Sequence, residues 1–521
     1  MRRYVLLILF AAVLGLPYVM KLAVGGRSAK KQSIRAGVER LVIVTPHVGD
    51  IRREFESAFT RWYVARYGAE VELDFRVPGG SNDIKRMLDN IYRGYRQADG
   101  TLPGNVPVDL HVVWGGGDYF LDQELKPLGI LQPLKLDPKL LEQVFPQPTL
   151  AGVKLYDSSK DPRGQPAPQW VGVCLSSFGI VYNPDLYRTL HLPEPRQWQD
   201  LTHERLAGLV ALADPSHSAS AALAYMMVLQ RAMADAEEAF FAENPALKTL
   251  PRAELAKNAN YQRAIGRGWK QGMKTLLLIA ANARYFTNVS SFVPNDVGNG
   301  QAAAGMAIDF YGRVYQESVG ADRCKFIAPA AATAITPDPV AVLYGVKGPQ
   351  EELANRFVEF LLSPEGQRLW ILKAGEPGGP RERSLRRLPV RQDVYRDRRG
   401  WTDDVNPFAE AGGFNQRAEW MGTYGEMRAI WLAAWIDSRE ALRDAYGKVL
   451  QVNDPQKRAE LIDNLADLPI TMEDVAALRI KRKEAEAAHK GDEWKAGNRI
   501  HWAQTFERHY QRVAKAAEAA R

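Results

Sequence analysis

The sequence is poor in the side chains that build covalent crosslinks and metal centres. Its 521 residues include only 2 cysteines, Cys174 and Cys324, and 8 histidines that stand singly along the chain. Two thiols are too few for a disulfide framework or for a site with several thiolate ligands. The sequence leaves open whether these cysteines pair with each other outside the cytoplasm or stay as two separate buried thiols.

The motifs of common catalytic centres are also missing. The sequence contains neither G-x-S-x-G nor H-E-x-x-H and has no P-loop, and Gly115-Gly116-Gly117 lacks the spacing of a dinucleotide fingerprint. We therefore assign no catalytic residue and expect no cofactor. A secreted enzyme is the weakest of the functional alternatives.

A large excess of charge of one sign is absent as well. The 68 basic and 61 acidic residues leave a net charge of +7, and no basic stripe dominates the sequence. A nucleic-acid surface would need such a stripe, so no nucleic-acid partner is expected. With 46% hydrophobic and 25% charged residues, the composition is that of a globular protein, which excludes wholesale disorder.

The N-terminus begins with a long uncharged apolar run from Tyr4 to Met20, preceded by Arg2 and Arg3. This is the layout of an export signal, so segment 1–36 is predicted to be a signal peptide or an N-terminal membrane anchor. The small residues at 23–25 favour cleavage, whereas the basic residues that follow the run disfavour translocation of that flank. Both alternatives predict a periplasmic or extracellular protein, in the second case anchored to the cytoplasmic membrane.

Strand and helix patterns alternate along most of the chain. Strands are predicted at 40–45, 71–75, 109–114, 170–182, 209–213, 305–310 and 326–328, and helices at 51–67, 83–93, 220–234, 261–282 and 351–372. This alternation is typical of parallel sheets covered by helices, an α/β fold. Segments 237–256 and 375–399 are expected to be a surface insertion and irregular surface, and the chain from 401 onward is expected to be helical.

Five separated segments carry a resemblance to a known family. They are the opening strand with Glu54-Phe55-Glu56-Ser57-Ala58-Phe59, then Phe178-Gly179-Ile180-Val181-Tyr182-Asn183, Trp198-Gln199-Asp200-Leu201 with Ala213-Asp214-Pro215-Ser216, Gly305-Met306-Ala307-Ile308-Asp309, and 357–367. Together these segments resemble the extracellular, or periplasmic, solute-binding proteins of ABC importers. The likeness is to the group that includes the iron, thiamine and phosphonate receptors.

The resemblance implies a two-lobed fold of the periplasmic-binding-protein type II with a hinge. Residues 37–169 and 330–400 would form lobe 1 and residues 170–329 lobe 2, with a C-terminal helical extension at 401–521. The hinge is expected near 170–173 and 340–344, and closure of the lobes would enclose the ligand. The implied partners are a small ligand and an ABC permease and ATPase complex, and the protein is expected to be a monomer.

Candidate ligand residues lie in loops that follow the predicted strands, where open α/β sheets bind their ligands. His47, Gly80, Ser81, Asn82, Ser216, Ser218, Ser220, Asp309 and Tyr311 occupy these loops. The glycine and serine groups before the helices at 83 and 220 offer backbone N–H groups and hydroxyls to an anion. The alternative is that these side chains only cap helices.

Two ligand chemistries stay open. Ferric receptors that this chain resembles usually carry two adjacent tyrosines after Asp309, whereas this sequence has only Tyr311. If the ligand is a metal, His47, Asp309 and Tyr311 are its candidate ligands. Otherwise Asp309 would pair with a cationic group of an organic solute while the serines hold its phosphate or phosphonate.

The expected function is an extracytoplasmic receptor that captures a metal ion such as ferric iron, or a small phosphorylated, phosphonate or cationic solute. It would deliver that ligand to a permease without performing chemistry. The alternative is a ligand-sensing or adaptor protein that uses the helical extension to bind its partner.

Overall fold

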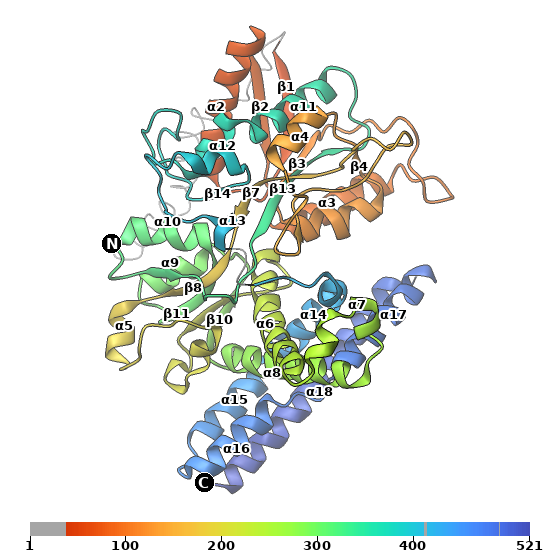
Figure 1. The fold of residues 1–521 in the computed structure, drawn as a ribbon. Coiled ribbons are helices and arrows are strands. Elements are labelled where there is room, and N and C mark those ends of the chain that lie inside the picture. Colours follow the sequence, from red (N-terminus) through yellow and green to blue (C-terminus); the bar gives the residue numbers. More distant parts are fainter. Residues whose placement is uncertain (1–37, 411–413, 489) are drawn as a thin grey trace, which may run out of the picture.

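The computed structural model describes residues 38–410, 414–488 and 490–521. Two α/β lobes stand one above the other, and the helices of the C-terminal extension lie beside the lower lobe (Figure 1). No helix of these described residues is both long and apolar enough to cross a membrane. The predicted signal or anchor segment, 1–36, lies outside the described residues.

The first lobe is built on one mixed sheet. Its strand order is β14-β7-β13-β3-β1-β2, with β4 paired to β13. The strands are β1 (Glu39–Val44), β2 (Val71–Arg76), β3 (Val112–Trp114), β4 (Leu131–Gln132), β7 (Val171–Ser176), β13 (Thr336–Leu343) and β14 (Leu388–Pro389). Strand β1 runs parallel to β2 and β3, while β13 is antiparallel to β3 and β7.

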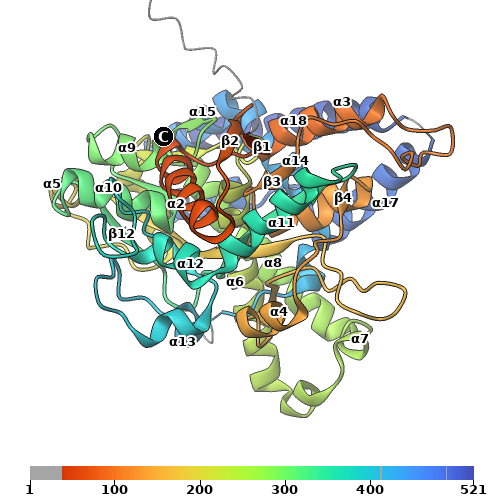
Figure 2. The same ribbon diagram turned by 90° about the horizontal axis from the view of Figure 1, so that it is seen from above.

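Aromatic side chains fill the space between this sheet and helices α2 (Gly49–Tyr67), α11 (Pro349–Leu362) and α12 (Pro364–Ile371). Phe55 of α2 lies 5.2 Å from the ring of Trp114 and 4.3 Å from the ring of Trp370. In the view from above, α2, α11 and α12 lie over the first lobe (Figure 2). The lobe also contains α3 (Ser81–Arg93), α4 (Pro138–Val144), α13 (Pro407–Glu410) and the hairpin of β5 (Thr149–Leu150) and β6 (Val153–Lys154).

The second lobe has a sheet of its own, in the order β10-β9-β11-β8-β12. Its strands are β8 (Phe178–Tyr182), β9 (Val210–Ala213), β10 (Ala283–Thr287), β11 (Ala304–Ile308) and β12 (Lys325–Ile327). Its helices are α5 (Pro184–Thr189), α6 (Ala219–Glu243), α7 (Arg252–Leu255), α8 (Ala259–Ala281), α9 (Phe292–Gly298) and α10 (Asp309–Val319). The predicted α/β fold with two lobes and a helical C-terminal region is confirmed.

The chain crosses between the lobes at two places. The long apolar segment expected at 170–182 is two strands, because β7 belongs to the first sheet and β8 to the second, with Ser177 between them. The return crossing lies between β12 and β13, at 328–335. Both crossings are therefore a few residues away from the expected hinge positions at 170–173 and 340–344.

Three sequence predictions of local structure are wrong. The helix expected at 351–372 is divided at Ser363-Pro364, where proline starts α12 and cannot continue α11. Helix α6 continues through the charged residues of the supposed insertion to Glu243, and ends only before Pro245. Segment 375–399, expected to be irregular surface, contains β14 and the fully buried side chain of Arg387.

The C-terminal extension shares its core with the second lobe. It consists of α14 (Tyr424–Trp431), η10 (Leu432–Asp437), α15 (Arg439–Leu450), α16 (Pro455–Ala466), α17 (Met472–Ala487) and α18 (Gly491–Ala519). The rings of Trp431 and Trp435 lie 5.7 Å and 5.3 Å from the ring of Tyr225 in α6. One continuous set of buried side chains therefore joins the extension to α6 and α8.

Cys174 and Cys324 are both buried and unpaired in the structure. Cys174 lies in β7, within the core of the first lobe, and Cys324 lies just before β12, in a separate cluster of the second lobe. Burial raises the pKa of both thiols, to about 12 for Cys324, so both side chains are protonated at neutral pH.

Candidate ligand-binding cleft

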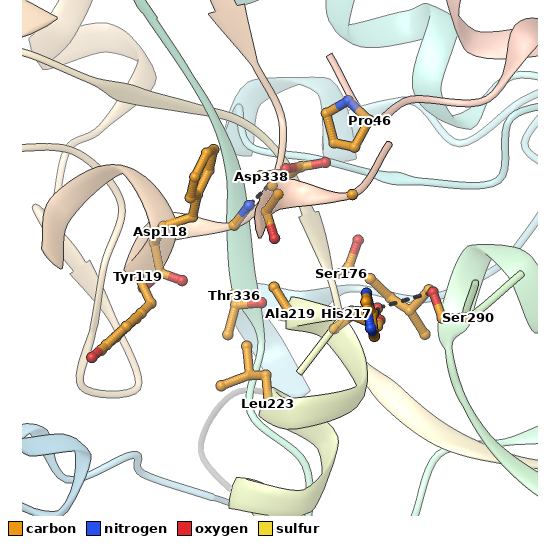
Figure 3. Close-up of a pocket in the computed structure, with 18 of the residues that line it drawn as sticks. Pro46, Asp118, Tyr119, Ser176, His217, Ala219, Leu223, Ser290, Thr336 and Asp338 are labelled. Atoms are coloured by element: carbon orange, nitrogen blue, oxygen red, sulfur yellow. Dashed lines mark hydrogen bonds between the residues drawn. The ribbon is translucent and has the colours of Figure 1, made fainter. Parts of the chain in front are cut away.

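A cavity of about 320 Å³ lies between the two lobes. The first lobe contributes His47, Gly80 and Ser81 to its wall, and the second lobe contributes Ser218 and Ser220. Figure 3 shows Thr336 and Asp338 on β13, just after the return crossing, facing the same space as His217 and Ser290. The cavity is within the size range of small-molecule sites.

A network of polar side chains lies at the crossing strands. The Arg387 guanidinium donates from Nη1 to Asp338 Oδ2 at 2.6 Å and from Nη2 to Ser176 Oγ at 3.0 Å. The Nε2 atom of His47 lies 3.0 Å from the same Asp338 oxygen, and the Gly117 N–H donates to Asp338 Oδ1 at 3.2 Å. This network joins β7 and β13, the strands next to the two crossings, to the loops that follow β1 and β3.

Burial and charge fix the ionisation of this network. Burial raises the pKa of Asp338, but the Arg387 guanidinium and His47 outweigh it and hold the pKa well below the ordinary value. Burial lowers the pKa of His47 despite its contact with Asp338, so the imidazole is neutral at pH 7. The network is thus an Arg⁺–Asp⁻ pair beside a neutral histidine.

Hydroxyl groups gather where α6 begins. Ser218 caps this helix by accepting from the Ala221 N–H at 3.2 Å. The Ser218 and Ser220 hydroxyls lie 3.1 Å apart, and Ser220 Oγ lies 3.2 Å from Ser290 Oγ. Gly80 and Ser81, at the beginning of α3, line the same cavity from the first lobe. Two helix starts on opposite lobes therefore open onto one space.

The lobes touch at this place. A Cβ atom on Gly80 would lie 2.8 Å from the carbonyl oxygen of His217, so only glycine allows this approach. The Asn82 amide donates to the carbonyl oxygen of Ser216, which is a second direct contact between the lobes. The structure is thus a closed form.

Six of the predicted candidate residues line the cavity: His47, Gly80, Ser81, Ser218, Ser220 and Tyr311. Asn82, Ser216 and Asp309 are not among the lining residues, since Asn82 and Ser216 contact each other and Asp309 is buried beneath the cavity. The Asp309 carboxylate accepts from the Ser177 and Phe310 N–H groups at 2.9 Å and 2.8 Å, and thereby holds the crossing residue Ser177.

The three candidate metal ligands have different surroundings. His47 contacts Asp338 and lies 3.3 Å from a nitrogen of the Arg387 guanidinium, whereas Asp309 is engaged by backbone N–H groups. Burial raises the pKa of Tyr311 to about 12, which disfavours a phenolate. Within the described ranges, no group of three or more His, Cys, Asp or Glu side chains is placed to hold a metal ion.

Several lining residues were missed by sequence reasoning, among them Ser176, Asp338, Arg387, Tyr424 and Arg428. The sequence Pro337-Asp338-Pro339 inside an apolar strand was an available signal, because proline in a strand interior marks a bulge or an edge. The register of β13 does shift at this position. Arg387 offered no signal, since it stands in an arginine-rich segment typical of exposed surface.

Two α/β lobes joined by two crossings, with a polar cavity closed between them, are the architecture of two-lobed ligand-binding proteins. Residues 123–378 match the model of a family described as bacterial extracellular solute-binding protein. The resemblance predicted from the five segments is therefore confirmed. This family and fold are those of binding proteins, and the family is described as extracellular.

Among curated proteins, the phosphoglycerate transport regulatory protein PgtC of Salmonella typhimurium is 27% identical over 199 residues. The alignment covers 38% of this chain and 40% of PgtC, so the chain spans less than half the length of this relative.

Two solved structures show the same fold. The periplasmic binding protein AfuA of Actinobacillus pleuropneumoniae, solved with exogenous fructose-6-phosphate, superposes with a TM-score of 0.52 and 16% identity over 76% of this chain and 98% of AfuA. The periplasmic binding protein P5PA superposes with a TM-score of 0.50 and 15% identity, over 76% of this chain and 99% of P5PA.

Proposed function

We propose that this protein captures a small phosphorylated organic solute between its lobes and delivers it to the permease of an ABC importer. The observation that carries the proposal is that α3 and α6, on opposite lobes, both begin at the wall of one cavity. The N-terminus of a helix presents N–H groups and the positive end of its dipole, which favour a phosphate.

The serine hydroxyls near these helix starts suit the same ligand. Ser81, Ser218, Ser220 and Ser290 all line the cavity, and hydroxyls donate readily to phosphate oxygens. A phosphate bound between the two helix starts would contact both lobes. Such a ligand favours the closed form because it interacts with both lobes only when they meet.

An organic solute fits this cavity better than a bare metal ion. The positive charge of Arg387 lies beside His47 and would repel a cation there, and the Asp309 carboxylate is already hydrogen-bonded. Phe178, Leu223 and Phe310 add apolar wall to the cavity. The carboxyl group of Asp118, also in the wall, can hydrogen-bond to the hydroxyl groups of a sugar or polyol in either ionisation state.

The name of PgtC agrees with this ligand class, since it refers to phosphoglycerate transport. The chain aligns with only 40% of PgtC, so the likeness supports the class of ligand and no particular compound.

The test is a calorimetric and thermal-shift comparison of fructose 6-phosphate and phosphoglycerate with their unphosphorylated counterparts and with ferric citrate. A ligand present at about 100 times its Kd adds about 2.7 kcal/mol to the stability of a protein that binds it only when folded. We expect a shift with phosphorylated compounds alone. A shift with ferric citrate only, or stoichiometric iron in protein purified without chelators, would contradict the proposal.

Ser218→Ala and Ser363→Ala make a matched pair of variants for this test. Each serine caps a helix, Ser218 for α6 and Ser363 for α12, so each loss costs about 1 kcal/mol of stability. Only Ser218 lines the cavity. We expect Ser218→Ala to weaken binding of the phosphorylated probe and Ser363→Ala to leave it unchanged; equal affinity in both variants would remove Ser218 from the site.

A second candidate function is ligand sensing, in which the closed protein contacts a signalling partner instead of a permease. The name of PgtC as a transport regulatory protein favours this candidate. Crosslinking of the protein in membranes of its own host separates the two functions. Recovery of a permease supports transport, and recovery of a membrane receptor without a permease supports sensing.

A further inference from the structure

Helix α14 of the C-terminal extension lies against the cavity. Tyr424 and Arg428, four residues apart and therefore on one face of the helix, both belong to the cavity wall. The two-lobed body alone does not supply these side chains. The cavity accordingly has three contributors: the first lobe, the second lobe and the extension.

Arg428 contacts both lobes at once. Its Nη1 atom lies 3.1 Å from Glu124 Oε1 in the first lobe, and its Nε atom donates to the Pro215 carbonyl oxygen in the second lobe at 3.0 Å. Only 11% of the Arg428 side chain and 13% of the Glu124 side chain are exposed. Lys85 of the first lobe also lies 3.6 Å from the Glu124 carboxylate.

Tyr424, like Arg428, contacts both lobes. Its hydroxyl donates to the carbonyl oxygen of Ala219, the first residue of α6, at 3.1 Å. Its ring centroid lies 4.4 Å from that of Tyr119 in the first lobe. The Tyr424 side chain is thus hydrogen-bonded to the second lobe and packed against the first.

The extension moves with the second lobe when the lobes separate. Trp431 and Trp435 pack on Tyr225 of α6, and the side chains of the extension continue the core of that lobe. Opening of the hinge would therefore break the Arg428–Glu124 and Tyr424–Tyr119 contacts while it preserves those with Pro215 and Ala219. The first two contacts belong to the closed form alone.

We propose that helix α14 is a third wall of the ligand cleft, in which Tyr424 contacts the ligand body and Arg428 fastens the extension to the first lobe on closure. The ligand contact rests on the proposed function. The fastening contact does not, because it joins protein groups only.

The fastening contact is tested with Arg428→Met, Glu124→Gln and the double variant. We expect each single variant to speed dissociation of fructose 6-phosphate or phosphoglycerate about 10-fold, as for other desolvated charge pairs across an interface. The double variant should show no additive loss, because both changes remove one interaction. Small-angle scattering of the ligand-free variants should show a larger radius of gyration than that of the wild type.

Arg499→Met is the matched control for Arg428→Met. Arg499 pairs with Asp437 at 2.7 Å within the extension, away from the cavity wall. We expect its dissociation rate and radius of gyration to equal those of the wild type. The same change in Arg499→Met as in Arg428→Met would overturn the proposal, since it would mean a general loosening of the extension.

The ligand contact of α14 is tested with Tyr424→Leu against Tyr446→Leu. Both tyrosines are buried in the extension, but Tyr446 lies in α15 and outside the cavity wall. We expect only Tyr424→Leu to change the preference between fructose 6-phosphate and phosphoglycerate. An unchanged preference overturns this part of the proposal.

Failure of the proposed function gives a different result from failure of the inference. If wild-type protein binds neither phosphorylated probe, the proposed ligand class is wrong, and the scattering of ligand-free Arg428→Met and Glu124→Gln still tests the fastening contact. If wild-type protein binds a probe and these two variants match it in dissociation rate and radius of gyration, the inference is wrong and the proposed function stands.

Discussion

The buried pair of Arg387 and Asp338 gives the sharpest prediction about stability. Arg387→Met would remove the guanidinium and leave the Asp338 carboxylate with only the Gly117 N–H and His47 as partners. The exposed fractions of the two side chains are 2% and 13%, so water does little to replace the lost charge. Removal of one partner from a buried pair costs about 3–5 kcal/mol.

Because two hydrogen bonds to Asp338 persist in the variant, we expect a loss near the lower end, about 3 kcal/mol in the free energy of unfolding at pH 7. With the steep urea dependence of a large protein, this loss lowers the unfolding midpoint by about 1 M urea. The assay is urea unfolding followed by tryptophan fluorescence. Retained wild-type stability at pH 7 would refute the reasoning.

The pH dependence of the loss has a definite sign. In the wild type the pKa of Asp338 is held below its ordinary value, so its stabilising contribution is present above pH 3.8 and is lost only as the pH falls through the lowered pKa. In Arg387→Met no guanidinium offsets the effect of burial on Asp338, so the pKa of the Asp338 carboxyl should rise. The stability deficit should therefore shrink from pH 7 toward pH 5, and should be partly reversed by adding Asp338→Asn.

Three further predictions concern closure and the cavity. Gly80→Ala places a methyl group against the His217 carbonyl oxygen and should weaken ligand binding and enlarge the ligand-free radius of gyration, whereas Gly94→Ala, with no atom nearer than 3.7 Å, should do neither. Burial raises the pKa of Asp118 to about 7, so wild-type stability should decline between pH 3.8 and about 7 relative to that of Asp118→Asn; parallel pH profiles would contradict this. Asp309→Ala should lower the unfolding midpoint without changing the affinity of the folded protein, because Asp309 lies beneath the cavity; a lost affinity at unchanged stability would place it in the site.

The overall fold followed from local patterns in the sequence. Helix α2 and strands β1 and β2 lie within one or two residues of the predicted segments, because apolar periodicity and flanking glycines mark them directly. The charged residues and prolines of 237–256 predict a surface insertion, but α6 continues to Glu243. Glu237 is buried there and bonded to Arg252 and Tyr261, a tertiary contact that composition does not reveal.

The sequence predicts the residues that line the cavity only where they lie in loops after strands or before helices. His47, Ser81, Ser218 and Ser220 follow strands or begin helices, so their sequence context places them at the carboxyl edge of a sheet. Arg387 and Arg428 reach the cavity from segments far away in the sequence, Arg387 through the pairing of β14 with β7 and Arg428 through the packing of α14. No local pattern encodes such an approach, which is why these two arginines were missed.

The contacts between the lobes affect the apparent affinity for the ligand. In a two-lobed receptor the apparent Kd is the intrinsic Kd divided by the fraction of protein already in the competent form. Asn82 with Ser216, Arg428 with Glu124, and the Arg387 guanidinium 4.3 Å above the Phe310 ring all join the lobes without a ligand. These contacts raise the closed fraction and so tighten apparent binding.

The same contacts make the ligand-free closed form resemble the ligand-bound form, so a partner that must respond to the ligand needs a surface that changes when the ligand binds. Because α14 lines the cavity and continues into the outer helices of the extension, the extension is the part of this molecule best placed to provide that surface.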